Sequence, residues 1–207
     1  MVRRPGNPLS APRWWISQSA RPHGRFASAF ALVLNVGNGR FNAAAVDALS
    51  RQLGDRVLDV GFGRGVGLRR ALAGAPIQVT GIDVSEELVS RAQRVFANDV
   101  RRGRLRLELG TVEAMPFPDE SFDGVYSVNC IYFWSDPARG LHEVCRVLRR
   151  GGMVVLGVDG RWKKLFRDPY SGYDADDAAD ALRSAGFVAV QSRPVTRHKA
   201  VVTAARP

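Results

Sequence analysis

Apolar and polar positions follow two different repeats along most of this chain. Short runs that are apolar or alternate strictly, as in buried strands, are followed by segments whose apolar residues recur every three or four positions, as on one face of a helix. The two kinds of segment alternate about five times between residues 57 and 158. This order predicts a parallel sheet with helices on both faces. The predicted strands are 57–60, 77–82, 105–109, 122–129 and 153–158.

Residues at the helix ends support this assignment. Ser85 is a predicted N-cap, followed by acidic residues in the first turn, where the helix dipole favours them. Asp136 with Pro137 predicts a second cap, with proline at the first helical position. Gly151 and Gly152 are predicted to end that helix. The predicted apolar face of the helix after Ser85 is Leu88, Ala92, Val95 and Phe96.

The two ends of the chain extend the pattern. Helices are predicted at 25–36 and 42–53, with Asn42 as the N-cap of the second. After a break at 159–173, a helix from Asp174 to Ala185 precedes strands 187–191 and 198–205. The short connection between these strands requires an antiparallel pair. The predicted fold is therefore a doubly wound, Rossmann-like, seven-stranded α/β sheet, mostly parallel, with an antiparallel C-terminal strand.

The length and composition indicate one globular domain. The chain has 207 residues, of which 45% are hydrophobic, and no apolar run approaches the roughly 18 residues that span a bilayer. Two cysteines without metal-ligand spacing indicate no metal site and a reduced, cytoplasmic setting. We expect a flexible arm at 1–22, cap helices at 23–53, a core at 54–158, a lid loop at 159–173 and the closing elements at 174–207.

The net charge of +10 is unevenly distributed. Residues 1–46 hold six arginines and no acid, so this segment carries +6 and the remainder carries 10 − 6 = +4. The globular part is therefore only mildly basic, which disfavours nucleic acid as a partner. The arm has the composition of a transit peptide, but its prolines and its lack of an amphipathic repeat argue against one.

The candidate chemistry lies around residues 57–67. Asp59 interrupts the first strand, and glycines follow at alternate positions from Gly61 to Gly67. Glycine turns of this kind also bind dinucleotides. A pyrophosphate would not tolerate a carboxylate at Asp59, whereas an ammonium or sulfonium would. Asp83 ends the second strand, 22 residues after Gly61, where a carboxylate can accept hydrogen bonds from ribose hydroxyls.

Four segments in order resemble class I S-adenosylmethionine-dependent methyltransferases, most closely the small-molecule branch that includes the ubiquinone/menaquinone-biosynthesis enzymes. They are Val57–Gly65, Gly81–Ser85, Gly110–Pro118 followed by Ser121–Ser127, and Leu141–Gly152. The resemblance runs from about residue 50 to 158. It implies S-adenosylmethionine as the cofactor and methyl transfer as the reaction.

The resemblance also implies roles for individual residues. Asp59 and the backbone of Val60, Gly61, Phe62 and Gly63 would face the methionine part of the cofactor. Asp83 would hold the ribose, and Val84 would contact the adenine. Thr111, Val112 and Glu113 would line the adenine edge, although many relatives carry aspartate in place of Thr111. Asn129 and Cys130 would flank the methionyl group and the reacting centre.

The acceptor is predicted to be a small apolar or aromatic molecule. The aromatic stretch 131–135 follows the fourth strand, where it either contacts the substrate or packs under the next helix. The sequence identifies no catalytic base, because His142 lies beside an apolar helix stripe and His23 lies in the N-terminal region. The oligomeric state is not predicted.

Alternative interpretations stay open at this point. Asp59 could cap the turn, and Asp83 could simply cap the next helix. An RNA methyltransferase could use the basic arm, although Ser127–Cys130 lacks the prolines found in two classes of base methyltransferase. A binding protein that keeps the fold without catalysis is the third reading.

Overall fold

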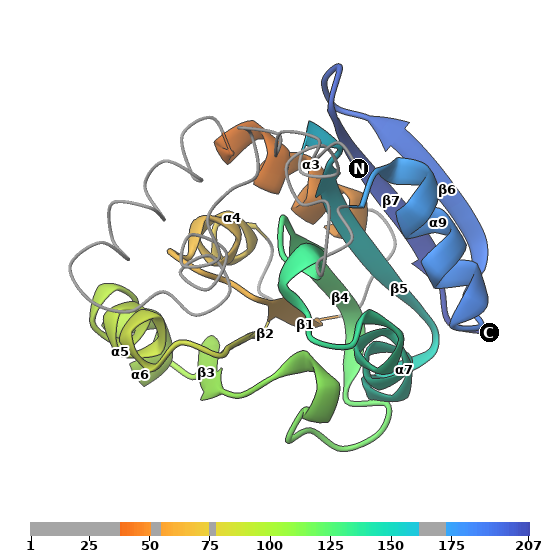
Figure 1. Ribbon diagram of the computed structural model, residues 1–207. Coiled ribbons are helices and arrows are strands. Elements are labelled where there is room, and N and C mark those ends of the chain that lie inside the picture. The colour runs from red at the N-terminus through yellow and green to blue at the C-terminus, as the bar shows by residue number, and fades with distance from the viewer. Residues whose placement is uncertain (1–37, 51–54, 75–77, 162–172) are drawn as a thin grey trace, which may run out of the picture.

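The computed structural model describes residues 38–50, 55–74, 78–161 and 173–207. Its centre is a seven-stranded sheet in the order β3-β2-β1-β4-β5-β7-β6 (Figure 1). The neighbours from β3 to β5 pair in parallel, and β7 runs antiparallel to both β5 and β6. The predicted fold is confirmed. The strands are β1 (Arg56–Val60), β2 (Gln78–Asp83), β3 (Leu105–Leu109), β4 (Phe122–Val128), β5 (Leu148–Asp159), β6 (Val188–Pro194) and β7 (Lys199–Ala205).

Helices cover both faces of the sheet (Figure 1). Successive strand residues point to opposite faces, so Val125 packs with the helices of one layer and Tyr126 with those of the other. One layer holds α3 (Gly39–Ser50), α4 (Val66–Leu72) and α5 (Glu86–Val95), followed by the short α6 (Ala97–Arg101). The other holds α7 (Pro137–Val147) and α9 (Ala175–Ser184). Single 3-10 turns lie at η1 (Val112–Ala114) and η2 (Ile131–Phe133).

Three predicted helix starts are confirmed. The Ser85 hydroxyl accepts a hydrogen bond from the Leu88 amide at 3.4 Å, and the Asp136 carboxylate accepts one from the Arg139 amide at 3.0 Å. Asp174 accepts hydrogen bonds from two amides of the first turn of α9. Each cap satisfies amide donors that lack a partner within the helix.

Two predicted boundaries were wrong. Asn42 is not an N-cap, because its backbone amide already bonds the carbonyl of Asn38 at 2.8 Å inside α3. Gly151 and Gly152 do not end a helix, because β5 begins at Leu148, which pairs with Phe122 before a register shift. A distant strand partner determines this start, and the local glycine signal does not report it.

The buried face of α5 also differs from the predicted one. Val89, Ala92 and Phe96 are buried, whereas Val95 is 51% exposed. The expected helix at 25–36, the arm, and most of the lid loop lie outside the described residues. Across the part of the chain that the structure describes, every helix is too short or too polar to serve as a bilayer-spanning segment.

Arg146 on α7 holds the loop that leads from η1 to β4. Its guanidinium donates to the carbonyl oxygens of Phe117 at 2.8 Å and Met115 at 3.1 Å. The same group contacts the carboxylates of Glu143 at 2.7 Å and Asp119 at 2.8 Å. These carboxylates raise the pKa of Arg146 and keep it charged.

Replacing Arg146 by methionine is expected to lower the free energy of unfolding by about 2–3 kcal/mol, because two carbonyl groups and two carboxylates lose a charged donor. The matched control is Arg183→Met on α9, whose side chain pairs only with the exposed Asp180. The control should change stability by less than about 0.5 kcal/mol. Urea denaturation measures both, and equal midpoints for the two variants would contradict the role given to Arg146.

Candidate functional site

The turn after β1 folds back onto the end of β2. The amide of Gly61 donates to the carbonyl of Ile82 at 2.8 Å, and the amide of Gly63 donates to the Asp83 carboxylate at 2.9 Å. Gly61, Gly63 and Gly65 have φ values of 73°, 53° and 78°, which side-chain-bearing residues rarely adopt. The turn therefore lies at the carboxyl edge of the sheet beside the β1–β4 switch point, where ligands bind in such folds.

The glycines serve different purposes. A Cβ on Gly61 would lie 2.1 Å from the Cys130 sulfur, and one on Gly67 would lie 2.8 Å from an Asp59 carboxylate oxygen. These two positions need glycine for packing. A Cβ on Gly63 would meet no atom of the described residues within 4 Å. The backbone at Gly63 is therefore open to a ligand.

Asp83 closes the turn with both of its carboxylate oxygens. One oxygen accepts from Gly63, and the other accepts from the Ser85 amide at 3.0 Å. Burial raises the pKa of Asp83, and the backbone hydrogen bonds oppose that rise. Ser85, rather than Asp83, is the side-chain cap of α5. Asp83 therefore joins two elements and retains lone pairs for a further donor.

Asp59 is buried between the sheet and the helices α3 and α4. Its carboxylate, the Tyr126 ring and the Asn42 amide all converge where a Cβ of Gly67 would stand. Burial raises the pKa of Asp59 to about 8, against a lowering contact from Tyr126, and the Asp83 charge adds to the rise. The Tyr126 hydroxyl approaches Asp59 without a hydrogen bond of standard geometry. The carboxylate thus lies buried with no full counter-charge among the described residues.

The end of β4 brings two further predicted residues to the turn. Asn129 has a φ of 55°, and its backbone amide donates to the carbonyl of Gly157 at 2.8 Å. The Cys130 sulfur lies against Gly61. Burial raises the pKa of the Cys130 thiol to about 12, so the thiol stays protonated and is no nucleophile. Cys130, Asp59 and Asp83 thus lie against residues 61–67, and Asn129 directly precedes Cys130.

The residues predicted to line the adenine differ from one another in burial and in contacts. Val84 is 40% exposed beyond β2, and Thr111 is half-buried just before η1. Val112 is buried against α7 near Gly140. Glu113 accepts hydrogen bonds from the amide and hydroxyl of Ser135 at 2.7 and 2.9 Å, and these bonds lower its pKa against the effect of burial. The Glu113 carboxylate therefore ties η1 to the start of α7.

Several aromatic side chains of this region serve packing. The Phe62 ring is 5% exposed and would contact a Cβ at Gly81 within 2.7 Å, so the backbone of Phe62 is the part that can face a ligand. Tyr132 and Trp134 are buried, and Trp134 packs against Gly140 of α7. For Trp134, packing under the next helix is the reading that the structure supports. His142 is exposed and hydrogen-bonds the carbonyl of Ala138 at 2.8 Å.

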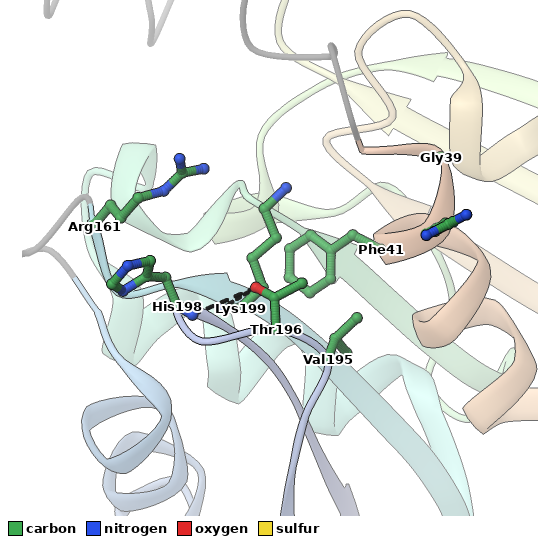
Figure 2. Close-up of a pocket in the computed structure, with 8 residues that line it drawn as sticks. Gly39, Phe41, Arg161, Val195, Thr196, His198 and Lys199 are labelled. Carbon is green, nitrogen blue, oxygen red and sulfur yellow. Dashed lines mark hydrogen bonds between the residues drawn. The ribbon is translucent and has the colours of Figure 1, made fainter.

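The structure contains a pocket that the sequence did not predict. Figure 2 shows a pocket of about 650 Å³ beside the end of β5. Its walls come from three distant segments, so no local motif marks it. The one available signal was the antiparallel closing strand, which pairs Lys199 with Asp159 and brings its first residues to the edge where β5 ends. The lining residues are Gly39, Arg40, Phe41, Arg161, Val195, Thr196, His198 and Lys199.

Replacing Gly61 by alanine is expected to destabilise the fold by about 2–4 kcal/mol, because left-handed strain and the overlap with the Cys130 sulfur add together. The matched control is Gly103→Ala, which has a φ of 69° but open space around it. The Gly103→Ala control should lower the free energy of unfolding only by the backbone strain, about 1–2 kcal/mol. Chemical denaturation compares them, and equal losses would show that Cys130 does not restrict this position.

Replacing Asp59 by asparagine is expected to raise the free energy of unfolding at pH 8 by about 1–3 kcal/mol, because a neutral amide then replaces the buried carboxylate. The Asp59 pKa is about 8 in the folded protein and near 3.8 in the unfolded chain. The folded protein therefore binds more protons between these values, and its stability falls as the pH rises through this window.

The asparagine variant lacks this titration, so its advantage over the unaltered protein should grow from pH 5 to pH 8. Urea denaturation at the two pH values measures the difference. An advantage of equal size at both would mean that Asp59 does not titrate in this range.

Comparison with known proteins supports the fold and the site together. A model of the methyltransferase domain family matches residues 58–156. The chain is 30% identical over 151 residues to YdaC of Bacillus subtilis, an uncharacterized methyltransferase, and the match covers 72% of this chain and 81% of that protein. It is 36% identical over 137 residues to the ubiquinone/menaquinone biosynthesis C-methyltransferase UbiE of Geobacter sulfurreducens, covering 65% and 54%.

A solved structure extends the similarity over almost the whole chain. The SAM-dependent methyltransferase of Thermotoga maritima, a possible histamine N-methyltransferase, is 25% identical with a TM-score of 0.66. The match covers 94% of this chain and 99% of that one. The chain spans about half the length of several curated relatives, including the Geobacter protein. With its matched domain, its relative in Bacillus and its glycine turn at the switch point, the chain belongs to the S-adenosylmethionine-dependent methyltransferases.

Proposed function

We propose that the chain transfers a methyl group from S-adenosylmethionine to a small molecule. The observation that carries the proposal is the pairing of two buried carboxylates, Asp59 and Asp83, around one open glycine turn at the carboxyl edge of the sheet. The names of the relatives support a small acceptor. The Geobacter relative is named for ubiquinone and menaquinone biosynthesis, and the Thermotoga structure is titled a possible histamine N-methyltransferase.

The residues present suit each part of this cofactor. Asp83 has free lone pairs for ribose hydroxyls, and the open backbone at Gly63 lets a ligand come close. Val84 and Leu109 are 40% and 52% exposed at the ends of adjacent strands, where they offer an apolar contact to adenine. Thr111 supplies a hydroxyl beside them. The negative potential of Asp59 favours an ammonium and a sulfonium.

The cofactor supplies an electrophilic methyl group, so the protein needs mainly to align the acceptor and exclude water. Asn129, Cys130 and the Gly61–Gly63 backbone would form the wall beside the reacting centre. The protonated thiol of Cys130 adds no charge to that wall. Asp59 would be held ionised by a bound cation, although its pKa is raised in the free protein.

The two alternatives from the sequence receive no support of this kind. The RNA reading depended on the arginine-rich arm at 1–22, which lies outside the described residues. The binding-protein reading predicts no particular chemistry around the turn. Methyl transfer to a small molecule is therefore the function that we propose.

Replacing Asp83 by alanine is expected to weaken binding of S-adenosylhomocysteine by at least about tenfold, because a carboxylate bond to two hydroxyls and the anchor of Gly63 are both lost. Isothermal titration calorimetry measures the affinity. The matched control is Asp123→Asn, a buried aspartate at the opposite edge of the sheet that pairs with Arg56 and Arg149.

The control variant should lose stability but keep its affinity for S-adenosylhomocysteine. Asp83→Asn adds a milder test, because its amide oxygen can still accept from Gly63. Unchanged affinity in the alanine variant would remove Asp83 from the site, and absence of binding by the unaltered protein would refute the proposed function.

A further inference from the structure

The pocket of Figure 2 adjoins the proposed cofactor site through α3. Phe41 of this helix lines the pocket, and the next residue, Asn42, reaches the space shared by Gly67 and Asp59. Phe41 also packs over the end of the sheet, where a Cβ on Gly157 would lie 3.1 Å from its ring. The pocket therefore lies at the same edge of the sheet as the glycine turn. Its volume of about 650 Å³ is that of a small-molecule site.

A chain of hydrogen bonds gives a second link between the two sites. The Tyr132 hydroxyl donates to the Asn129 side chain at 3.5 Å and accepts from the backbone amide of Asp159. The Asp159 carboxylate in turn holds Arg161, with a guanidinium contact of 2.6 Å. The end of β4, which borders the reacting centre, is thus fixed relative to the wall of the pocket.

The pocket carries more positive than negative charge. Arg40, Arg161 and Lys199 line it. Figure 2 shows the side chains of Arg161 and Lys199. Asp159 is 1% exposed and is paired with Arg161 in a two-oxygen contact, so this carboxylate is already neutralised. No ion pair with a described carboxylate is formed by Arg40 or Lys199 within the described ranges. Two cationic side chains therefore remain for a ligand.

The Lys199 side chain is half-buried, and two contacts hold its ammonium in the pocket. Its ammonium donates to the Asn38 side chain at 2.6 Å and lies 5.2 Å from the centre of the Phe41 ring. Burial lowers the pKa of Lys199, and the Arg161 charge lowers it further against the effect of Asp159. An ammonium has three donors, and the described contacts use one of them. An anion in the pocket would accept from the remaining donors and offset the cost of burying the charge.

The other residues that line the pocket indicate the polarity of the rest of the ligand. Phe41 and Val195 are apolar, while Thr196 and His198, from the same turn as Val195, add polar groups. A wholly apolar acceptor would make no hydrogen bond to these cationic groups. An acceptor with an apolar or aromatic body and one anionic group satisfies both kinds of wall.

We propose that this pocket binds the methyl acceptor through an anionic group, a carboxylate or a phosphate, held by Lys199 and Arg40 beside the Arg161–Asp159 pair. The proposal rests on the proposed function, because it takes the neighbouring glycine turn as the cofactor site. It narrows the acceptor from any small molecule to one that is acidic.

The test uses the full chain, with S-adenosylhomocysteine present at saturation and ligand-observed NMR titration as the measurement. The probes are phenyl phosphate, benzoate and the neutral benzyl alcohol. At least one anionic probe should bind about tenfold or more tightly than benzyl alcohol, because charged hydrogen bonds contribute on this scale. The anionic probe with the higher affinity shows whether the acidic group of the acceptor is a phosphate or a carboxylate.

Two variants locate the anion. Lys199→Gln keeps an amide donor for Asn38 and removes the charge, and Arg40→Gln removes the second cation. Each should weaken the preferred anionic probe by about tenfold and leave benzyl alcohol unchanged. The control is Arg102→Gln, an exposed arginine that follows α6 and is remote from the pocket. It should leave all affinities unchanged.

The affinity for S-adenosylhomocysteine, measured separately by calorimetry, distinguishes the possible failures. Weaker cofactor binding in Lys199→Gln would mean that the pocket holds the carboxylate of the cofactor, which overturns the proposal. Normal cofactor binding with equal affinities for charged and neutral probes would overturn it as well, and the methyltransferase assignment would stand. Absence of cofactor binding by the unaltered protein would refute the function itself.

Discussion

The hydrogen bond from the Gly63 amide to the Asp83 carboxylate holds the candidate site together. It joins the turn after β1 to the end of β2, and the second oxygen of Asp83 reaches the start of α5 through Ser85. Three elements are thereby fixed by one side chain. Because glycines sample many backbone conformations, this hydrogen bond favours the left-handed turn over the alternatives. The open backbone of Gly63 depends directly on it.

This arrangement brings two acidic groups close together in a part of the protein that excludes water. Asp59 lies 3% exposed and Asp83 8% exposed, and each raises the energy of the other when ionised. Burial of uncompensated carboxylates opposes folding. Their presence is understandable if the site is built for a ligand that carries positive charge and hydroxyl groups. The same logic, with the sign reversed, applies to the cationic pocket beside β5.

Much of the fold could be predicted because its signals are local. Ser85, Asp136 and Asp174 lie directly before the helices that they cap, and the strand pattern alone indicated the parallel sheet with its antiparallel end. The start of β5 was missed, because its pairing with Phe122 is a contact between distant segments. In the site, Asp59, Asp83 and the glycines were found from one short motif each. The use of Glu113 as a link to Ser135, and the pocket around Lys199, depend on contacts that no single stretch of sequence contains.

The turn between β6 and β7 has a consequence for how such a protein could change its substrate. The amides of Val195 and Thr196 both donate to the carbonyl of Lys199, at 2.8 and 3.1 Å, so the turn is closed by its own backbone. The Thr196 hydroxyl also accepts from the amides of His198 and Lys199, at 3.4 and 3.2 Å, so Val195 and His198 are the positions whose side chains can be exchanged with little effect on the turn. The glycine turn has no such freedom, because each of its positions is restricted by a contact or by its backbone. If the proposed sites are correct, acceptor and cofactor recognition lie on parts of the chain with different tolerance to mutation, and exchanges at Val195 or His198 would change the acceptor pocket while the cofactor site stays as it is.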